Sequence, residues 1–146
     1  MITPELEDAY RSSLYVFDAV PVNGEESEDG SVVLKIDTAS PALHALHRRH
    51  AVDCSCFITA CNPFSQRLDE QTNLRRQEML AAELRSRSLV FLPGTGRHPA
   101  NGWPAEPSFL VLGLALEASK NLGRHYEQNA MVWAGTDAVP RLVILA

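Results

Sequence analysis

The segment Phe57–Cys61 carries apolar or small side chains at nearly every position, so neither face of a strand built from it suits water. Pro63 follows closely and ends the strand, because proline has no N–H to donate to a ladder. A strand that is apolar on both faces belongs inside a sheet that is covered on both sides. We therefore predict that Phe57–Cys61 is a central strand of a sheet covered by helices.

Other apolar and β-branched runs predict further strands. They lie at residues 14–17, 31–36, 89–92, 109–112, 130–134 and 141–145. Helical signals alternate with strands in the middle of the chain, which favours parallel crossovers, and the close spacing near both ends favours antiparallel pairs. The sequence thus predicts an α/β (mixed α+β) domain with a mixed sheet of about five to seven strands, covered by about three helices.

Helix starts are marked by capping residues. Ser40 followed by Pro41 is typical of an N-cap and first helical position, and Asp69 is an expected N-cap for a helix to about residue 88. A loop rich in glycine and proline is expected over residues 93–107, and a last helix over 114–127.

Residues 1–146 are expected to form one domain, since this length supports a single core. Residues 23–30 are polar, acidic and bracketed by glycines, which indicates an exposed connection. The formal net charge of −5 argues against DNA as a partner, because an acidic chain lacks the field that attracts phosphates.

Membrane and export signals are not found in the sequence. No apolar run approaches the roughly 20 residues of a membrane helix. The acidic N-terminus lacks the basic start and apolar stretch of a signal peptide. We therefore expect a soluble, cytoplasmic protein whose three cysteines stay reduced.

Four runs of residues resemble the motifs of one family. These are Phe57–Ser65, Asn73–Arg76, the pair Gly94–Gly96 with Trp103–Phe109, and Leu122–Ala130. Together they resemble the DUF3293 family, a bacterial domain of unknown function. The resemblance extends over about residues 10–145. It supports a single-domain interpretation and implies no established activity.

The end of the central strand is a candidate binding site. Asn62 and Ser65 follow the strand, and ligands of open α/β sheets bind beyond the carboxyl ends of strands. Asn62 precedes proline, which favours an extended backbone and an amide that points into a crevice. The alternative is an Asx-type turn that only ends the strand.

The long helix after Asp69 carries polar residues on its apolar side. At about 100° per residue, one face combines apolar residues with amides. The residues on this face are Leu74, Leu80, Ala81, Leu84, Asn73 and Gln77, with Arg76 at its edge. Asn73 and Arg76 are therefore candidates for ligand binding. The alternative is a structural network that joins the helix to the Asn62 loop.

Glu106 stands at the entry to a predicted strand, where a carboxylate can act as a general base or a ligand anchor. It is the candidate catalytic residue. The alternative is a solvated acid, or one paired with Arg76 or Arg124. Gln128 and Arg124, near the end of the last helix, are further candidates for the same crevice, and Asn129 is expected to end that helix in a left-handed conformation.

Two further patterns are given structural interpretations. Gly94–Arg97 lacks the Gly-Lys-Ser/Thr ending of a phosphate loop, so we expect a turn. A histidine- and cysteine-containing stretch does not match the usual zinc spacing. It comprises His44, His47, His50, Cys54 and Cys56. We expect no metal and no cofactor.

The leading hypothesis is a domain that binds a small polar or anionic ligand, such as a nucleotide, with catalysis left open. Its proposed site is Asn62, Ser65, Asn73, Arg76, Glu106, Arg124 and Gln128. The alternative is a protein-interaction module in which these residues are internal supports. A weaker alternative is RNA binding through Arg75, Arg76 and Trp103.

Overall fold

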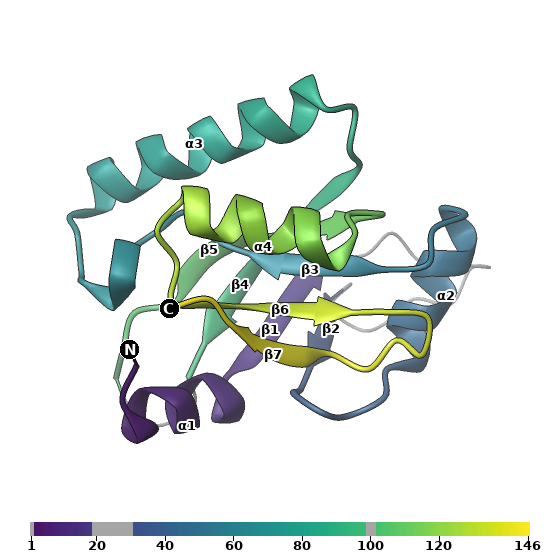
Figure 1. The fold of residues 1–146 in the computed structure, drawn as a ribbon, viewed down its shortest axis with the longest axis horizontal. Coiled ribbons are helices and arrows are strands. Elements are labelled where there is room, and N and C mark those ends of the chain that lie inside the picture. Colours follow the sequence, from purple (N-terminus) through teal and green to yellow (C-terminus); the bar gives the residue numbers. More distant parts are fainter. Residues whose placement is uncertain (1, 19–30, 99–101) are drawn as a thin grey trace.

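The computed structural model describes residues 2–18, 31–98 and 102–146 of the chain. The predicted acidic connection at 23–30 lies outside these residues. Within them, seven strands form one sheet in the order β2-β1-β4-β5-β3-β6-β7 (Figure 1). The strands are β1 (Leu14–Asp18), β2 (Ser31–Leu34), β3 (Ser55–Ile58), β4 (Phe91–Arg97), β5 (Glu106–Leu112), β6 (Ala130–Ala134) and β7 (Arg141–Ile144). The helices are α1 (Pro4–Ser12), α2 (Pro41–Arg49), α3 (Glu70–Ser86) and α4 (Leu116–His125), with a 3-10 turn η1 at Pro63–Ser65.

The mixed α+β class and the number of strands are confirmed. The strand predicted at Phe57–Cys61 is inside the sheet, where β3 pairs with β5 and β6 and is buried at every position. It begins and ends earlier than predicted, at Ser55 and Ile58. None of the helices within the described ranges is long and apolar enough to cross a membrane.

The parallel pairs expected in the middle of the chain are wrong, because every pair of described strands is antiparallel. The two helical crossovers interleave. The connection through α3 joins β3 to β4, which run in the same direction but have β5 between them. The connection through α4 joins β5 to β6 across β3. Each crossover thus spans a strand of opposite direction.

The loop and turn predicted at Gly94–Arg97 are also wrong, because these residues continue β4 and pair with β1 and β5. Gly94 is required here by close packing. A Cβ added to Gly94 would lie 2.6 Å from the Val16 carbonyl oxygen and 2.8 Å from the Phe57 ring. Only a residue without a side chain lets Phe57 fill the space beside β4.

The sheet is curled, so it has an inner and an outer face. Successive residues along a strand point to opposite faces and belong to two separate hydrophobic clusters. Along β3, Phe57 belongs to the inner cluster, whereas Cys56 and Ile58 belong to the outer one, which is covered by α3 and α4. The helices α1 and α2 lie at different ends of the curl (Figure 1).

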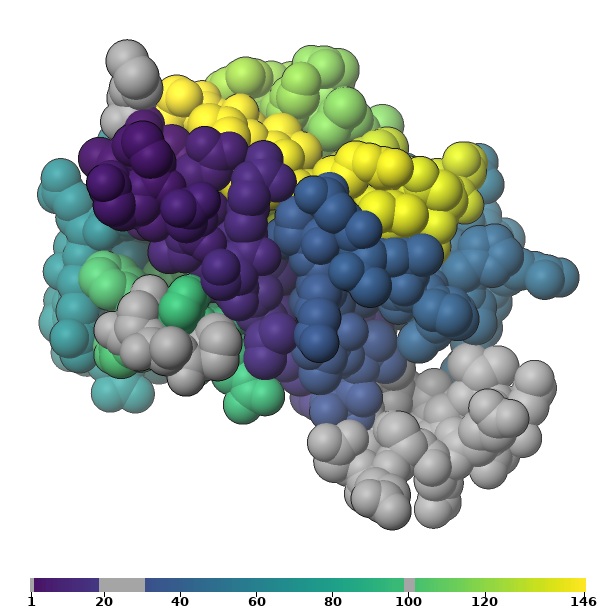
Figure 2. Space-filling model, turned by 90° about the horizontal axis from the view of Figure 1, so that it is seen from below, coloured from purple at the N-terminus to yellow at the C-terminus, as the bar shows by residue number. Residues whose placement is uncertain are grey.

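Backbone hydrogen bonds join the segment after β2 to the β6–β7 connection. Asp37 N–H donates to the Pro140 carbonyl (2.7 Å), and Ser40 N–H donates to that of Ala138 (3.1 Å). Figure 2 shows the two segments side by side on the surface. These bonds hold the two edges of the sheet toward each other at the α2 end.

Both predicted helix caps are confirmed. The Ser40 hydroxyl accepts from Leu43 N–H, and the Asp69 carboxylate accepts from Thr72 N–H, each at 3.1 Å. Leu74 was placed on the buried side of α3, and this is wrong, since its side chain is 57% exposed. At this end of α3 the buried contact is polar instead, because the Gln77 side chain accepts from Ala60 N–H at 3.0 Å.

A pair of alanine substitutions tests the packing along β4. We expect Gly94→Ala to lower the free energy of unfolding by about 1–3 kcal/mol, because the added methyl group overpacks the inner core. Gly96→Ala is the matched control. Its Cβ would meet its nearest neighbours at 3.8–3.9 Å, so its stability should change little. Urea denaturation measures both, and equal stability of the two variants would contradict this account.

Candidate functional site

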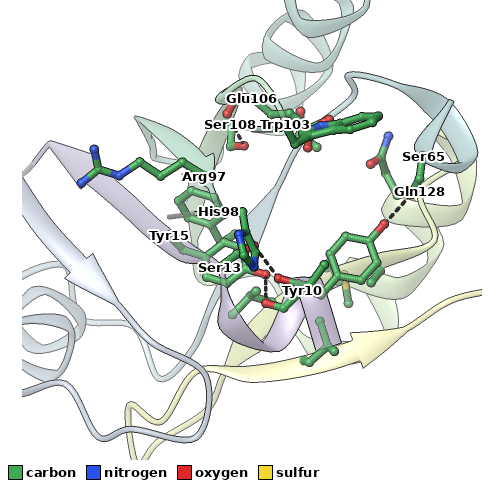
Figure 3. Close-up of a pocket in the computed structure, with 18 of the residues that line it drawn as sticks. Tyr10, Ser13, Tyr15, Ser65, Arg97, His98, Trp103, Glu106, Ser108 and Gln128 are labelled. Carbon is green, nitrogen blue, oxygen red and sulfur yellow. Dashed lines mark hydrogen bonds between the residues drawn. The ribbon is translucent and has the colours of Figure 1, made fainter. Parts of the chain in front are cut away.

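The inner side of the curl opens into a cavity beside α1, with a volume of ≈ 160 Å³ (Figure 3). Its apolar walls come from inner-face residues of the sheet such as Phe57, Val132 and Leu142, and from Leu6 of α1. Its polar lining includes Tyr10, Ser65, Asn62, Glu106, Ser108 and Gln128. Several separate segments thus contribute to one concave site, as in the mouths of β-barrels.

Glu106 begins β5 and presents its carboxylate to this cavity. One carboxylate oxygen accepts from the Asn62 amide at 2.5 Å. Burial raises the pKa of Glu106, and hydrogen bonds from Asn62 and Trp103 act in the opposite direction without cancelling it. The Glu106 carboxyl is therefore held in an environment that disfavours its charge.

Tyr10 and Ser65 form the part of the rim contributed by α1 and η1. Their hydroxyl oxygens are 2.5 Å apart, and the Asn129 amide donates to the Ser65 hydroxyl at 2.9 Å. The Tyr15 hydroxyl donates to the Tyr10 carbonyl at 2.6 Å, which ties the end of α1 to β1. Burial is the main cause that raises the pKa of Tyr10. Tyr10 is thus a neutral hydrogen-bonding group at neutral pH.

The Asn62 backbone is left-handed (φ 48°, ψ 66°), so the predicted extended conformation is wrong. Asn73 holds it there. Asn62 N–H donates to the Asn73 side-chain oxygen at 2.9 Å, and the Asn73 amide donates to the Asn62 side-chain oxygen at 2.8 Å. Phe64 and Ser65 are also left-handed. This left-handed turn sets Ser65 and the Asn62 side-chain amide beside the cavity.

Gln128 lies on the cavity wall with its orientation fixed. Its side-chain nitrogen donates to the carbonyls of Cys61 (3.0 Å) and Tyr126 (3.1 Å), which uses both amide hydrogens. Its side-chain oxygen accepts no hydrogen bond from the described residues. The left-handed residue after α4 is Glu127 (φ 59°), so the assignment of that conformation to Asn129 is wrong.

Three predicted site residues lie outside the cavity lining: Asn73, Arg76 and Arg124. Arg76 donates to the carbonyls of Ala60 (2.6 Å) and Tyr126 (2.7 Å), and Arg124 is exposed. Within the described part of the chain, neither arginine forms a salt bridge with Glu106. The structure therefore brings Asn62, Ser65, Glu106 and Gln128 together and uses Arg76 as an internal support.

Sequence reasoning missed several wall residues, among them Tyr15, Ser108 and Gly96. The alternation of the strands contains a signal for them, since Ser108 lies two positions before the inner-face residue Leu110. Finding them required the correct bounds of β4 and β5, which the sequence pattern did not provide.

The histidine and cysteine stretch packs as ordinary structure. The His47 ring is buried with its Nε2 2.8 Å from the Ser55 hydroxyl, and the Cys54 thiol donates to the Leu114 carbonyl. Among the residues that the structure describes, no group of three His, Cys, Asp or Glu residues could hold a metal ion. The absence of a bound metal stays a prediction.

The fold and the cavity define a mixed α+β domain with a polar recess at the mouth of a curled antiparallel sheet. The model of a family described as "Protein of unknown function (DUF3293)" matches residues 58–131, and the chain belongs to this family. The match includes all seven predicted site residues and excludes α1. Neither a search of curated proteins nor a search of solved structures found a match.

Substitution of two neighbouring arginines on α3 tests the internal role of Arg76. Arg76→Ala leaves the Ala60 and Tyr126 carbonyls without these donors, so we expect a loss of about 1–3 kcal/mol in the free energy of unfolding. Arg75→Ala, at an exposed position, should change it by less than about 0.5 kcal/mol. Chemical denaturation measures both variants. A neutral Arg76→Ala would show that Arg76 is not a structural support.

The raised pKa of Glu106 predicts a pH-dependent effect on stability. The folded state takes up the proton at higher pH than the unfolded state, whose value is near 4.5. The protein therefore loses stability as pH rises from about 4.5 through the folded pKa. Glu106→Gln, which stays neutral, should be more stable than the parent at pH 8, and this advantage should vanish at pH 4. Melting curves across this range check the sign.

Proposed function

We propose that this domain binds a small polar molecule in the cavity between α1 and the inner face of the sheet. The observation that carries the proposal is a ≈ 160 Å³ recess in which Glu106, Tyr10, Ser65 and Gln128 converge above apolar walls. Ligand sites in proteins have this composition, in which apolar walls hold the body of the ligand and a few polar groups orient it.

The arrangement favours a neutral or positively charged ligand over an anion. Arg76 and Arg124, which motivated the anionic interpretation, lie outside the cavity lining. Arg97 lines the rim but is exposed, and Figure 3 shows its guanidinium directed away from the cavity. The charged group that the cavity offers a ligand is therefore the Glu106 carboxylate. A general-base role for Glu106 would use the same group.

The alternatives are supported less well. In a protein-interaction module, the whole polar cluster would be structural. Asn73 and Arg76 fit that description as internal supports, but Glu106 and Tyr10 face a cavity. The RNA-binding hypothesis relied on Arg75, Arg76 and Trp103. Arg76 supports it less well, because its side chain donates to two backbone carbonyls. Small-molecule binding is the function that accounts for the recess.

A melting-shift screen against nucleosides, amides, amines and organic acids tests the proposal. We expect at least one compound to raise the melting temperature of the parent. Gly96→Val places a branched side chain near Tyr15, Phe57 and Ser108 and should abolish the shift, because it fills the cavity. Ala82→Val, at an exposed position on α3, is the control and should retain it. A shift that survives in Gly96→Val would place binding elsewhere.

A further inference from the structure

The fixed polar groups of the cavity are mainly hydrogen-bond acceptors. The Gln128 amide hydrogens are committed to backbone carbonyls, so its side-chain oxygen is the group left for a ligand. The Glu106 carboxylate can only accept while it is ionised. The Asn62 side-chain amide donates to Glu106. The Asn62 side-chain oxygen accepts from Leu68 N–H and from the Asn73 amide. The Gln128 oxygen and the Glu106 carboxylate therefore favour a ligand that supplies donors.

Glu106 forms no salt bridge within the described part of the chain, and its pKa is shifted by burial, Asn62 and Trp103 and not by a cation. Three ionisable groups feel the negative charge of Glu106: Tyr10, Tyr15 and Cys61. Each has a raised pKa, mainly through burial, and the negative charge of Glu106 adds to the shift. None of the three can carry a positive charge. Hydrogen bonds from Asn62 and Trp103 offset only part of the cost of burying this carboxylate, and a cation in contact with it would offset more.

The basic side chains near the cavity do not fill this role. Arg97 points away from the cavity, and His98 lies on the opposite side of it from Glu106 (Figure 3). Arg76 acts on the nearby Cys61 but binds backbone carbonyls and Glu127. The missing positive charge is thus one that a ligand can supply.

The size and walls of the cavity limit the body of that ligand. A cavity of about 150 Å³ lined by apolar side chains holds one benzene ring, and this one measures ≈ 160 Å³. Aromatic side chains surround it, with Tyr15 and Phe57 on the inner face and Trp103 at the rim. Such walls suit a flat or compact body of about one ring.

We infer that the ligand is an organic cation, in which an amidinium or ammonium group pairs with the Glu106 carboxylate and a ring-sized apolar body lies between Phe57 and Trp103. This inference rests on the proposed function and adds the chemical class of the ligand. It follows from the Glu106 and Gln128 acceptors, from a carboxylate with hydrogen-bond donors but no salt bridge among the described residues, and from the size of the cavity.

Three probes of one shape and different charge test the inference: benzamidine (cation), benzamide (neutral) and benzoate (anion). Calorimetric titration at pH 8 is expected to show binding of benzamidine at least about tenfold tighter than binding of benzamide, with no binding of benzoate. Lowering the pH through the Glu106 pKa should weaken benzamidine binding, because protonation removes the charge that the amidinium pairs with.

Matched variants locate the effect. Glu106→Gln should weaken benzamidine binding more than about tenfold. Glu78→Gln, the same substitution at an exposed position on α3, should not alter it. Circular dichroism establishes that both variants are folded, and the pH dependence of the parent gives a second readout that needs no variant.

Failure of the inference differs from failure of the proposed function. If benzamide or benzoate binds as tightly as benzamidine, or if none of the three binds, the cationic ligand is wrong. The proposed function would still stand if another compound in the melting-shift screen bound and was lost in Gly96→Val. It would fall only if no compound of that screen bound in the cavity.

Discussion

Ala60, Cys61 and Asn62 leave the sheet at the end of β3 but stay buried, so their backbone groups must find partners without a neighbouring strand. Side chains supply them. Gln77 accepts from Ala60 N–H, Arg76 donates to the Ala60 carbonyl, and Gln128 donates to the Cys61 carbonyl. Asn73 accepts from Asn62 N–H. This requirement sets the position of α3 and of the residues after α4.

The same network shapes the candidate site. Because Asn73 holds Asn62 in a left-handed turn, the Asn62 amide reaches Glu106 and the following turn places Ser65 against Tyr10. Because Gln128 is anchored through its nitrogen, it presents an acceptor to the cavity. The polar residues therefore form two sets. One set supports the backbone behind the cavity lining, and the other set lines the cavity. The two sets depend on each other, since loss of a support would displace the groups that line the cavity.

The inner face of the sheet provides the remaining half of the site. Phe57 packs edge-on against Tyr15, with ring centroids 5.4 Å apart, and Gly94 makes room for it. Gly96, two residues further along β4, lines the cavity. Gly94 thus permits close packing of Phe57, and Gly96 leaves space for the cavity. The recess is the unfilled end of the inner core, and α1 forms one side of it.

Much of this arrangement could be read from the chain alone. The two-sided burial of Phe57 and Ile58, the caps at Ser40 and Asp69, and the family follow from local patterns, because hydrophobic periodicity and capping act over a few residues. The positions of Glu106 and Asn62 at strand ends predicted that both were candidate site residues. The hydrogen bond between them could not be predicted from the sequence.

Tertiary structure alone decided which strands are neighbours and which polar residues meet. Arg76 and Glu106 were both candidate ligand-binding residues by sequence, yet Arg76 binds backbone carbonyls and Glu106 faces the cavity. The glycines of residues 94–97 predicted a turn, but pairing with β1 and β5 makes these residues part of β4. Local sequence determines what each segment can form. The pairing of β3 with β5 and β6 involves residues more than fifty positions apart, and no local pattern encodes it.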